Sequence, residues 1–294
     1  MRTLRLVGAM AICALTVTSL AGCGDDNEDE PSYPIVNVEG SRISAINDFK
    51  ISYDDRGRVD MIVNTATREQ MTVDYGKNRI TIKGVESDGE GQTLNFDYNH
   101  KGYIKSISAV WDYYDADDDE HVKGSGRTQY SYDDKGHLIT VLTVSGGTET
   151  NFSTGVSTAM RVDVDSHLKW SGSNLVSVEI DGTETADGRT QTIKDATTVE
   201  YGTQANSSLQ LPMSLADIYM ANFFINDDFI EIMAAVGLFG IGPKELPTRI
   251  TERETDGDTD TYTLTYSLNS DGTIAAESAN GQPAYRYVYT LYTK

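Results

Sequence analysis

The chain has 294 residues, of which 24 are basic and 45 acidic, and its formal net charge is −21. This excess of acid argues against nucleic acid as a partner, because a phosphate backbone is bound by clustered Lys and Arg side chains. Both cysteines, Cys13 and Cys23, lie near the N-terminus. The rest of the chain therefore forms no disulfide or thiolate metal site and holds no cysteine nucleophile.

The N-terminal segment has the pattern of a bacterial lipoprotein signal. Arg2 and Arg5 precede an apolar run over residues 6–17 that is too short to span a bilayer, and Leu20-Ala21-Gly22-Cys23 follows it. This pattern predicts that residues 1–22 are removed and that Cys23 is fatty-acylated, which makes the membrane a partner of the mature chain. An ordinary secretory signal with a chance cysteine is the alternative.

An acidic, flexible tether is predicted over residues 23–40. Residues 24–30 include no apolar side chain, and Pro31 and Pro34 follow them. Such a segment has nothing to bury and is typical of a solvated spacer. Residues 41–294 are then expected to form a single antiparallel β domain.

A short phrase recurs along the chain: an aromatic residue, two or three polar turn formers and a glycine, as in Tyr-Asp-Asp-Arg-Gly at 53–57. It occurs within residues 53–59, 98–104 and 132–138, with a weaker copy at 268–274. In each copy the glycine can take a positive φ, and an apolar residue then starts the next strand. This is the chemistry of a β-hairpin, and we expect hairpin turns at these places.

Between the turns, apolar residues alternate with polar ones. Tyr262, Leu264, Tyr266 and Leu268 share one face of a strand, while Thr and Ser residues share the other. Strands joined consecutively by tight turns form an antiparallel meander, and a meander of about ten strands or more must curl because its twist accumulates. The predicted fold is mainly β: a large antiparallel meander curled into a half-barrel or a closed barrel.

One apolar stretch, residues 209–246, breaks this alternation. Ser214–Asp217 has the form of a capping box, and apolar residues recur at helical spacing from Phe229 to Val236. We expect a two-helix insertion over about residues 214–239, split near residues 226–228 and packed on the concave face or mouth of the sheet. A lid over an apolar ligand cavity is the alternative.

These features together resemble one family. The lipobox, the acidic leader, the repeated Tyr-Asp-x-x-Gly hairpins and the late apolar insertion are similar to a Bacteroidetes-type family of outer-membrane lipoproteins of unknown function with a porin-like fold. The resemblance covers most of residues 45–294 and implies a lipid-anchored outer-membrane protein exposed on the cell surface. The acids behind Cys23 also resemble an export signal of such lipoproteins, although a plain solvated linker has the same composition. Because the function of that family is unknown, the resemblance identifies no catalytic residues in this chain.

The porin-like description concerns strand topology alone. Lys77, Arg79 and Lys83 stand beside short apolar runs. A transmembrane barrel needs an outward apolar band, which these residues do not form.

Asp115, Asp117 and Asp119 are the candidate metal ligands, because they lie in the densest acidic run and carboxylate oxygens suit calcium. A solvated hairpin tip is the alternative, since neither a glycine nor a distal glutamate completes a known calcium loop. Residues 256–260 open like an EF-hand loop but lack its later glycine and glutamate, so we expect a hairpin turn there. No other cofactor is expected.

Trp111, Tyr113, Tyr114 and Trp170 are the candidate ligand-binding residues. Flat amphipathic rings desolvate at low cost and can stack on sugars or peptides. Packing within the sheet is the alternative use of these side chains.

No catalytic residues stand out in the sequence. The four histidines form no metal-binding pair, and His100 and His137 lie in or beside the repeated turns, where we expect them to be exposed. No serine lies in a nucleophile elbow, and no pair of carboxylates is distinguished from the others. We therefore expect a protein that is not an enzyme.

Our first hypothesis for the function is a surface-displayed, lipid-anchored binding protein that contacts a glycan, a peptide or another envelope protein through its hairpin loops. One alternative is a carrier that holds a small apolar ligand in a barrel cavity under residues 214–239. A hydrolase with an unrecognised carboxylate site is the second alternative.

Overall fold

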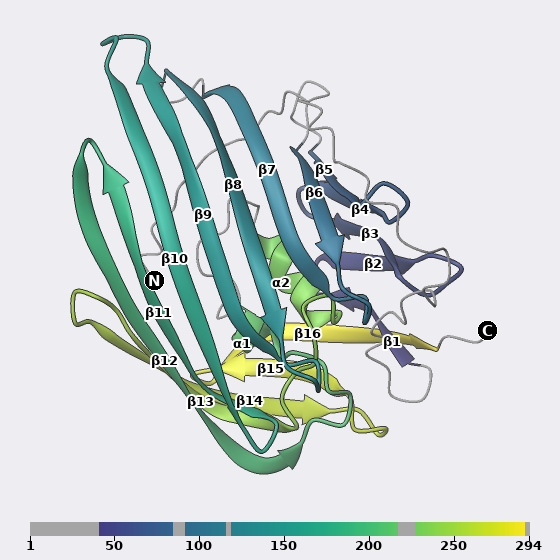
Figure 1. The fold of residues 1–294 in the computed structure, drawn as a ribbon. Helices are drawn as coiled ribbons and strands as arrows, with labels where there is room; N and C mark the ends of the chain where they lie inside the picture. Colours follow the sequence, from purple (N-terminus) through teal and green to yellow (C-terminus); the bar gives the residue numbers. More distant parts are fainter. Residues whose placement is uncertain (1–40, 85–91, 116–118, 217–226, 292–294) are drawn as a thin grey trace.

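The computed structural model describes residues 41–84, 92–115, 119–216 and 227–291. Within these ranges sixteen strands close into one antiparallel barrel, and two short helices lie inside it (Figure 1). The strands are β1 (Ser41–Ile46), β2 (Phe49–Tyr53), β3 (Val59–Asn64), β4 (Gln70–Asp74), β5 (Arg79–Lys83), β6 (Gln92–Tyr98), β7 (Ile104–Asp115), β8 (Glu120–Tyr132), β9 (Leu138–Asn151), β10 (Ser157–Ser171), β11 (Asn174–Ala186), β12 (Arg189–Ala205), β13 (Glu245–Arg253), β14 (Thr259–Leu268), β15 (Ile274–Ala279) and β16 (Gln282–Leu291). The helices are α1 (Met213–Ala216) and α2 (Asp227–Ala235).

Each strand pairs with its neighbours along the chain, as in a meander. The barrel closes where β1 meets β16 in antiparallel register, with Ser41 opposite Leu291 and Ile46 opposite Tyr287. The predicted antiparallel meander is therefore confirmed. Of the two predicted forms, the half-barrel and the closed barrel, the closed barrel is the one observed.

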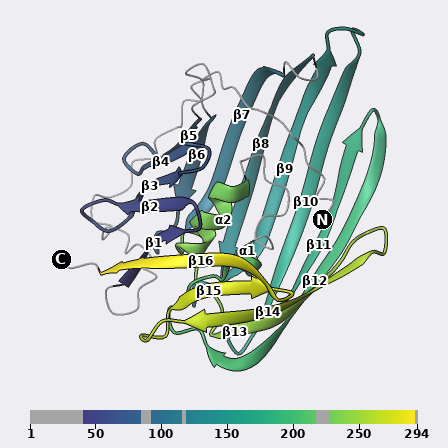
Figure 2. The same cartoon turned by 180° about the vertical axis from the view of Figure 1, so that it is seen from behind.

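The barrel wall is uneven in height. Strands β1 to β6 have 5 to 7 residues each, whereas β7 to β12 have 12 to 17. Figures 1 and 2 show the long strands as a curved wall that rises well above the rest of the barrel. The turns at the top of this wall are consequently far from the packed interior.

The two ends of the barrel differ in what they carry. Ser41 at the start of β1 and Leu291 at the end of β16 are paired, so both lie at one end, which we call the base. Because consecutive strands are antiparallel, turns that follow odd-numbered strands lie at the opposite end, which we call the tip end. The β7–β8 and β9–β10 turns therefore lie at the end of the barrel opposite Ser41, where the preceding residues join it.

The repeated phrases fold as turns with one common set of hydrogen bonds. In the first, Asp54 Oδ1 accepts the backbone N–H groups of Arg56 and Arg58 at 3.0 and 2.8 Å. Asn99 and Asp133 accept the corresponding bonds in their own turns, and the glycines of the three turns have φ values from 79° to 95°. The prediction of hairpin turns at these places is confirmed.

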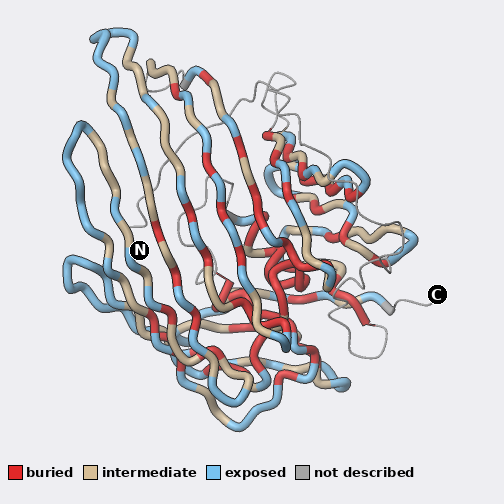
Figure 3. Tube along the Cα trace, in the orientation of Figure 1, coloured by how far each residue is buried: buried red, intermediate tan, exposed pale blue. Residues whose placement is uncertain are grey.

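The two faces of β10 have opposite character. On β10, Val164 and Leu168 point into the barrel and are buried, whereas Arg161, His167 and Lys169 are exposed on the outside. Figure 3 shows that buried residues gather around the helices and that the upper parts of the long strands are more exposed. The charged outer positions of β10 suit contact with water, because a lipid-facing barrel presents an apolar band there.

The insertion fills the interior of the barrel. The ring of Phe229 lies 5.6 Å from that of Phe49 in an edge-to-face contact, and Phe239 lies 4.9 Å from Tyr130. The α2 residues with side chains no more than 2% exposed are Phe229, Ile230, Ile232, Met233, Ala234 and Ala235. The predicted packing on the concave face is confirmed, and α2 is an element of the core. No helix in the described ranges is long and apolar enough to cross a membrane.

A distant carboxylate caps α1. The side chain of Glu277, on β15, accepts the backbone N–H groups of Met213 and Ser214 at 2.9 and 3.2 Å and also the hydroxyl of Tyr287. The prediction that Ser214 begins the helix is therefore wrong: α1 begins one residue earlier, and its cap comes from the barrel wall. Asp217, the other end of the predicted capping box, lies outside the described residues.

Candidate functional site

The four predicted aromatic residues do not meet on one surface. Tyr113 is buried inside the barrel with 8% exposure, whereas its neighbour Tyr114 is 52% exposed on the outer face. Trp111 points inward on the same side as Tyr113, and its indole leaves no room for a Cβ atom on Gly124, which would lie 2.7 Å from the ring. Tyr114 is therefore the most exposed of the three, as the alternation of side chains along a strand requires.

Trp170 lies at the base and packs against a histidine. Its ring is stacked 4.3 Å from His137 at 15°, and its Nε1 donates to the carbonyl of Leu138 at 2.8 Å. The expectation that His137 is exposed is wrong, since the residue is only 4% exposed. The stacking on Trp170 and the 2.8 Å bond to Asp133 explain this burial. Partial burial opposes the ionisation of Asp133, but bonds from His137 and Lys135 hold its pKa below the usual value.

A group of exposed rings does come together at the tip end. Tyr114 from β7, His121 from β8 and Phe152 from the β9–β10 turn form what we call the tip cluster. The ring centroids of Tyr114 and Phe152 are 5.6 Å apart, and His121 is stacked on Phe152 at 6.2 Å and 20°. Phe152 is 59% exposed, so the cluster presents apolar ring surface directly to water.

Hydrogen bonds that Asp119 accepts hold the tip cluster in place. One carboxylate oxygen accepts the Tyr114 hydroxyl at 2.7 Å, and the other accepts the Ser153 hydroxyl. The Asp119 carbonyl accepts the N–H of Phe152 at 2.9 Å. The bonds from Ser153 and Tyr114 lower the pKa of Asp119, so it remains an acceptor over a wide pH range. The two neighbouring turns are thus tied together before any ligand arrives, which reduces the entropy lost on binding.

A second carboxylate positions the histidine. Asp112 Oδ1 lies 2.6 Å from His121 Nε2, and its Oδ2 lies 3.0 Å from Lys123 Nζ. Bonds from Lys123 and then His121 lower the pKa of Asp112. The rings of the tip cluster are therefore bordered by charged groups that can hydrogen-bond to a ligand. This combination of a flat apolar surface and a polar rim suits the stacking of a sugar or a peptide side chain.

The predicted calcium ligands fall partly outside the described residues. Asp117 and the side chain of Asp115 lie outside them, and both carboxylate oxygens of Asp119 accept hydrogen bonds from protein hydroxyls. No group of three potential metal ligands occurs among the residues that the structure describes. Calcium binding at this turn stays a prediction. The other acidic turn is a hairpin as expected, closed by the bond from Glu254 N–H to the Asp258 carbonyl at 2.9 Å.

Phe152 is not among the site residues predicted from the sequence. An aromatic residue between Asn151 and the polar stretch Ser153-Thr154-Gly155 is unusual for a turn, because such a ring has no strand neighbours to cover it. That contrast is the signal that could have identified it. Cys23 and the tether lie outside the described residues.

Two solved structures share this architecture. A porin-like protein from Bacteroides vulgatus has 14% sequence identity and a TM-score of 0.52, with 86% of this chain and 100% of that chain covered. A porin-like protein from Bacteroides uniformis has 17% identity and the same TM-score of 0.52, with 89% and 100% covered. This chain has a porin-like fold. No family model matches the sequence, and no curated protein matches it.

Proposed function

We propose that the protein is a lipid-anchored binding protein of the outer membrane. Acylated Cys23 and the tether over residues 23–40 hold the base of the barrel near the membrane, and the tip end faces outward from the cell. The ligand, a glycan or a peptide, stacks on the tip cluster and hydrogen-bonds to its charged border. The protein has no catalytic role in this proposal.

One observation carries the proposal: Tyr114 and Phe152 are more than half exposed yet are held in contact by bonds to Asp119. Large exposed rings cost solubility, and their fixed arrangement at the end opposite the tether serves contact with a partner. Each ring has little conformational freedom to lose on binding. The position on the tallest strands also keeps the cluster clear of the membrane.

A channel is a poor alternative because of the insertion. Porins conduct through a polar lumen, whereas the interior of this barrel holds a continuous apolar core from the strands and α2. The same packing disfavours the carrier, which needs an open cavity beneath residues 214–239. The hydrolase has little support, since Glu277, the one described carboxyl group whose pKa is raised, is occupied with capping α1.

The experiment is a screen of bacterial and host glycans and of peptides with the purified soluble domain, residues 24–294, followed by titration of the best ligand. We expect Tyr114→Ser combined with Phe152→Ser to weaken binding about 100-fold or more, because each buried ring contributes about 1.5–3 kcal/mol. Val288→Ser is the matched control, since Val288 is 56% exposed on β16, away from the cluster. Equal affinity in the double variant and the wild-type protein, with melting temperatures unchanged, contradicts the proposal.

A further inference from the structure

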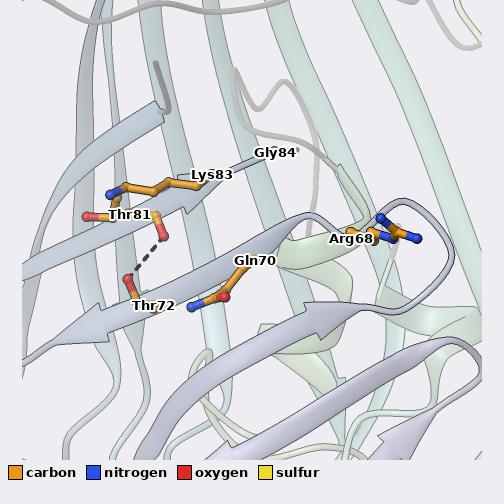
Figure 4. Close-up of a pocket in the computed structure, with 6 residues that line it drawn as sticks. All are labelled: Arg68, Gln70, Thr72, Thr81, Lys83 and Gly84. Carbon is orange, nitrogen blue, oxygen red and sulfur yellow. Dashed lines mark hydrogen bonds between the residues drawn. The ribbon is translucent and has the colours of Figure 1, made fainter. Parts of the chain in front are cut away.

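A polar hollow lies on the outer face of β4 and β5 at the tip end. It has a volume of about 370 Å³ and is lined by Arg68, Gln70, Thr72, Thr81, Lys83 and Gly84 (Figure 4). This volume is within the range of small-molecule sites, which is about 300–1,000 Å³. The hollow shares no residue with the tip cluster.

The strand register assembles the lining. Gln70 stands opposite Lys83 across the β4–β5 pair, and Thr72 stands opposite Thr81. The residues between them, such as Met71 and Ile82, are buried inside the barrel. The alternation of side chains therefore places an amide, two hydroxyls and an ammonium group side by side on the outside.

The charged side chains that line the hollow are basic, whereas the chain as a whole is acidic. Within the described residues, neither Arg68 nor Lys83 forms an ion pair, although the protein has a net charge of −21. Lys77, at the opposite end of the β4–β5 pair, by contrast pairs with Asp74 at 3.4 Å. The acid nearest to Arg68 along the chain, Glu69, accepts the hydroxyl of Thr67 at 3.0 Å, and its side chain lies beside Gly84 at the edge of the hollow. Two cations are thus available to a ligand in an otherwise acidic surface.

Arg68 also occupies an unfavourable backbone conformation. Its φ is 63°, in the left-handed region that favours glycine. Hydrogen bonds stabilise the turn, with Arg68 N–H donating to the Asn64 carbonyl at 2.8 Å and Asn64 Oδ1 accepting the N–H of Ala66 at 3.0 Å. The hairpin turn thus fixes the position of Arg68 at one end of the hollow.

We propose that this hollow binds an acidic saccharide of at least two sugar units. Figure 4 shows the Lys83 side chain extending along β5 toward Thr81, while Arg68 stands on the turn at the other end. Between these cations lie Gln70, Thr72 and Thr81. The Thr72 hydroxyl donates to the Thr81 carbonyl at 3.4 Å and can accept from a sugar hydroxyl, whereas the Gln70 amide and the Thr81 hydroxyl can both donate and accept. The two cations bind the carboxylates of a chain that is longer than a single phosphate or sulfate ion.

Calorimetric titration of the soluble domain with trigalacturonate tests the proposal, with maltotriose as the neutral probe and inorganic phosphate as the small anion. We expect trigalacturonate to bind, maltotriose not to bind, and added salt to weaken the binding. Arg68→Gln combined with Lys83→Gln is expected to lower the affinity at least about tenfold, because both charged hydrogen-bond donors to the ligand are lost. Lys77→Gln combined with Arg189→Gln removes the same charge elsewhere and should leave the affinity unchanged.

Arg68→Gly separates binding from folding. The glycine relieves the left-handed backbone, so the melting temperature should stay equal or rise while trigalacturonate binding falls. The proposal is overturned if both double variants lose affinity equally, if only phosphate binds, or if no probe binds. Tyr114→Ser combined with Phe152→Ser should leave trigalacturonate binding intact, so a failure here is distinct from a failure of the proposed function.

Discussion

Replacing Phe229 by alanine will lower the free energy of unfolding by about 3–5 kcal/mol, the usual cost of removing a buried aromatic ring. The Phe229 side chain is fully buried on α2, inside the barrel, and its ring contacts Phe49 on β2 edge to face. Alanine leaves a cavity between the insertion and the wall, and the closed sheet around it has little freedom to collapse. Urea unfolding followed by tryptophan fluorescence measures the loss as a lower midpoint with an unchanged slope.

Phe152→Ala is the matched control for this measurement. It deletes the same ring from a site that is 59% exposed, so the free energy of unfolding should change by about 0.5 kcal/mol or less. A loss of equal size in both variants would contradict the packing of α2 within the barrel.

Replacing Glu277 by alanine is expected to lower the free energy of unfolding by about 3 kcal/mol. The carboxylate accepts the N–H groups of Met213 and Ser214 and the hydroxyl of Tyr287. The Met213 N–H also donates to the Tyr287 hydroxyl at 3.0 Å, so alanine leaves chiefly the Ser214 N–H and the Tyr287 O–H without a partner, at a cost of about 1–3 kcal/mol each. Alanine also removes the cost of burying a carboxyl group, so the net loss of stability is smaller than the sum of these costs. The same urea measurement applies, with Glu179→Ala on the outer face of β11 as the control. A Glu277→Ala protein as stable as this control would exclude the capping role.

Glu277 also makes the stability depend on pH. Burial raises the pKa of this carboxyl group above its ordinary value of 4.5, although hydrogen bonds from Tyr287 and the α1 amides oppose the change. The folded protein then holds the proton more tightly than the unfolded chain, so this contribution is complete below pH 4.5 and is lost as the pH rises through the raised pKa. The glutamine in Glu277→Gln is neutral at every pH, so this variant should lose the part of the pH dependence of stability that Glu277 contributes. If the melting temperatures of the wild-type protein and Glu277→Gln changed in parallel with pH, Glu277 would not be the source of this pH dependence.

Local chemistry made much of the fold predictable. The turns at residues 54–58, 99–103 and 133–137 depend on an Asp or Asn that bonds to its own turn and on a glycine with positive φ, and all of these are visible in a short stretch of sequence. The strands follow from alternation and the insertion from its helical spacing. The closure of the barrel was not predictable to the same degree, because β1 and β16 pair across nearly the whole chain and neither strand has a local signal for its partner.

The candidate site was predictable only in part. Tyr114 was identified from its type, but the adjacent Tyr113 points the other way, and Trp170 is covered by His137. Phe152 joins the cluster through the pairing of β8 with β9, a contact that depends on tertiary structure. The cap of α1 likewise comes from Glu277, which is far along the chain. The local sequence at Ser214 therefore predicted the wrong capping residue.

The orientation of the barrel on the cell can be measured with one introduced cysteine. The part of the chain after Cys23 has no cysteine, so Val156→Cys, at a site that is 58% exposed beside the tip cluster, provides the single free thiol of the acylated protein. Intact cells that produce this variant are treated with a membrane-impermeant maleimide. The account predicts labelling as complete as in lysed cells. Labelling only after the outer membrane is ruptured would contradict it.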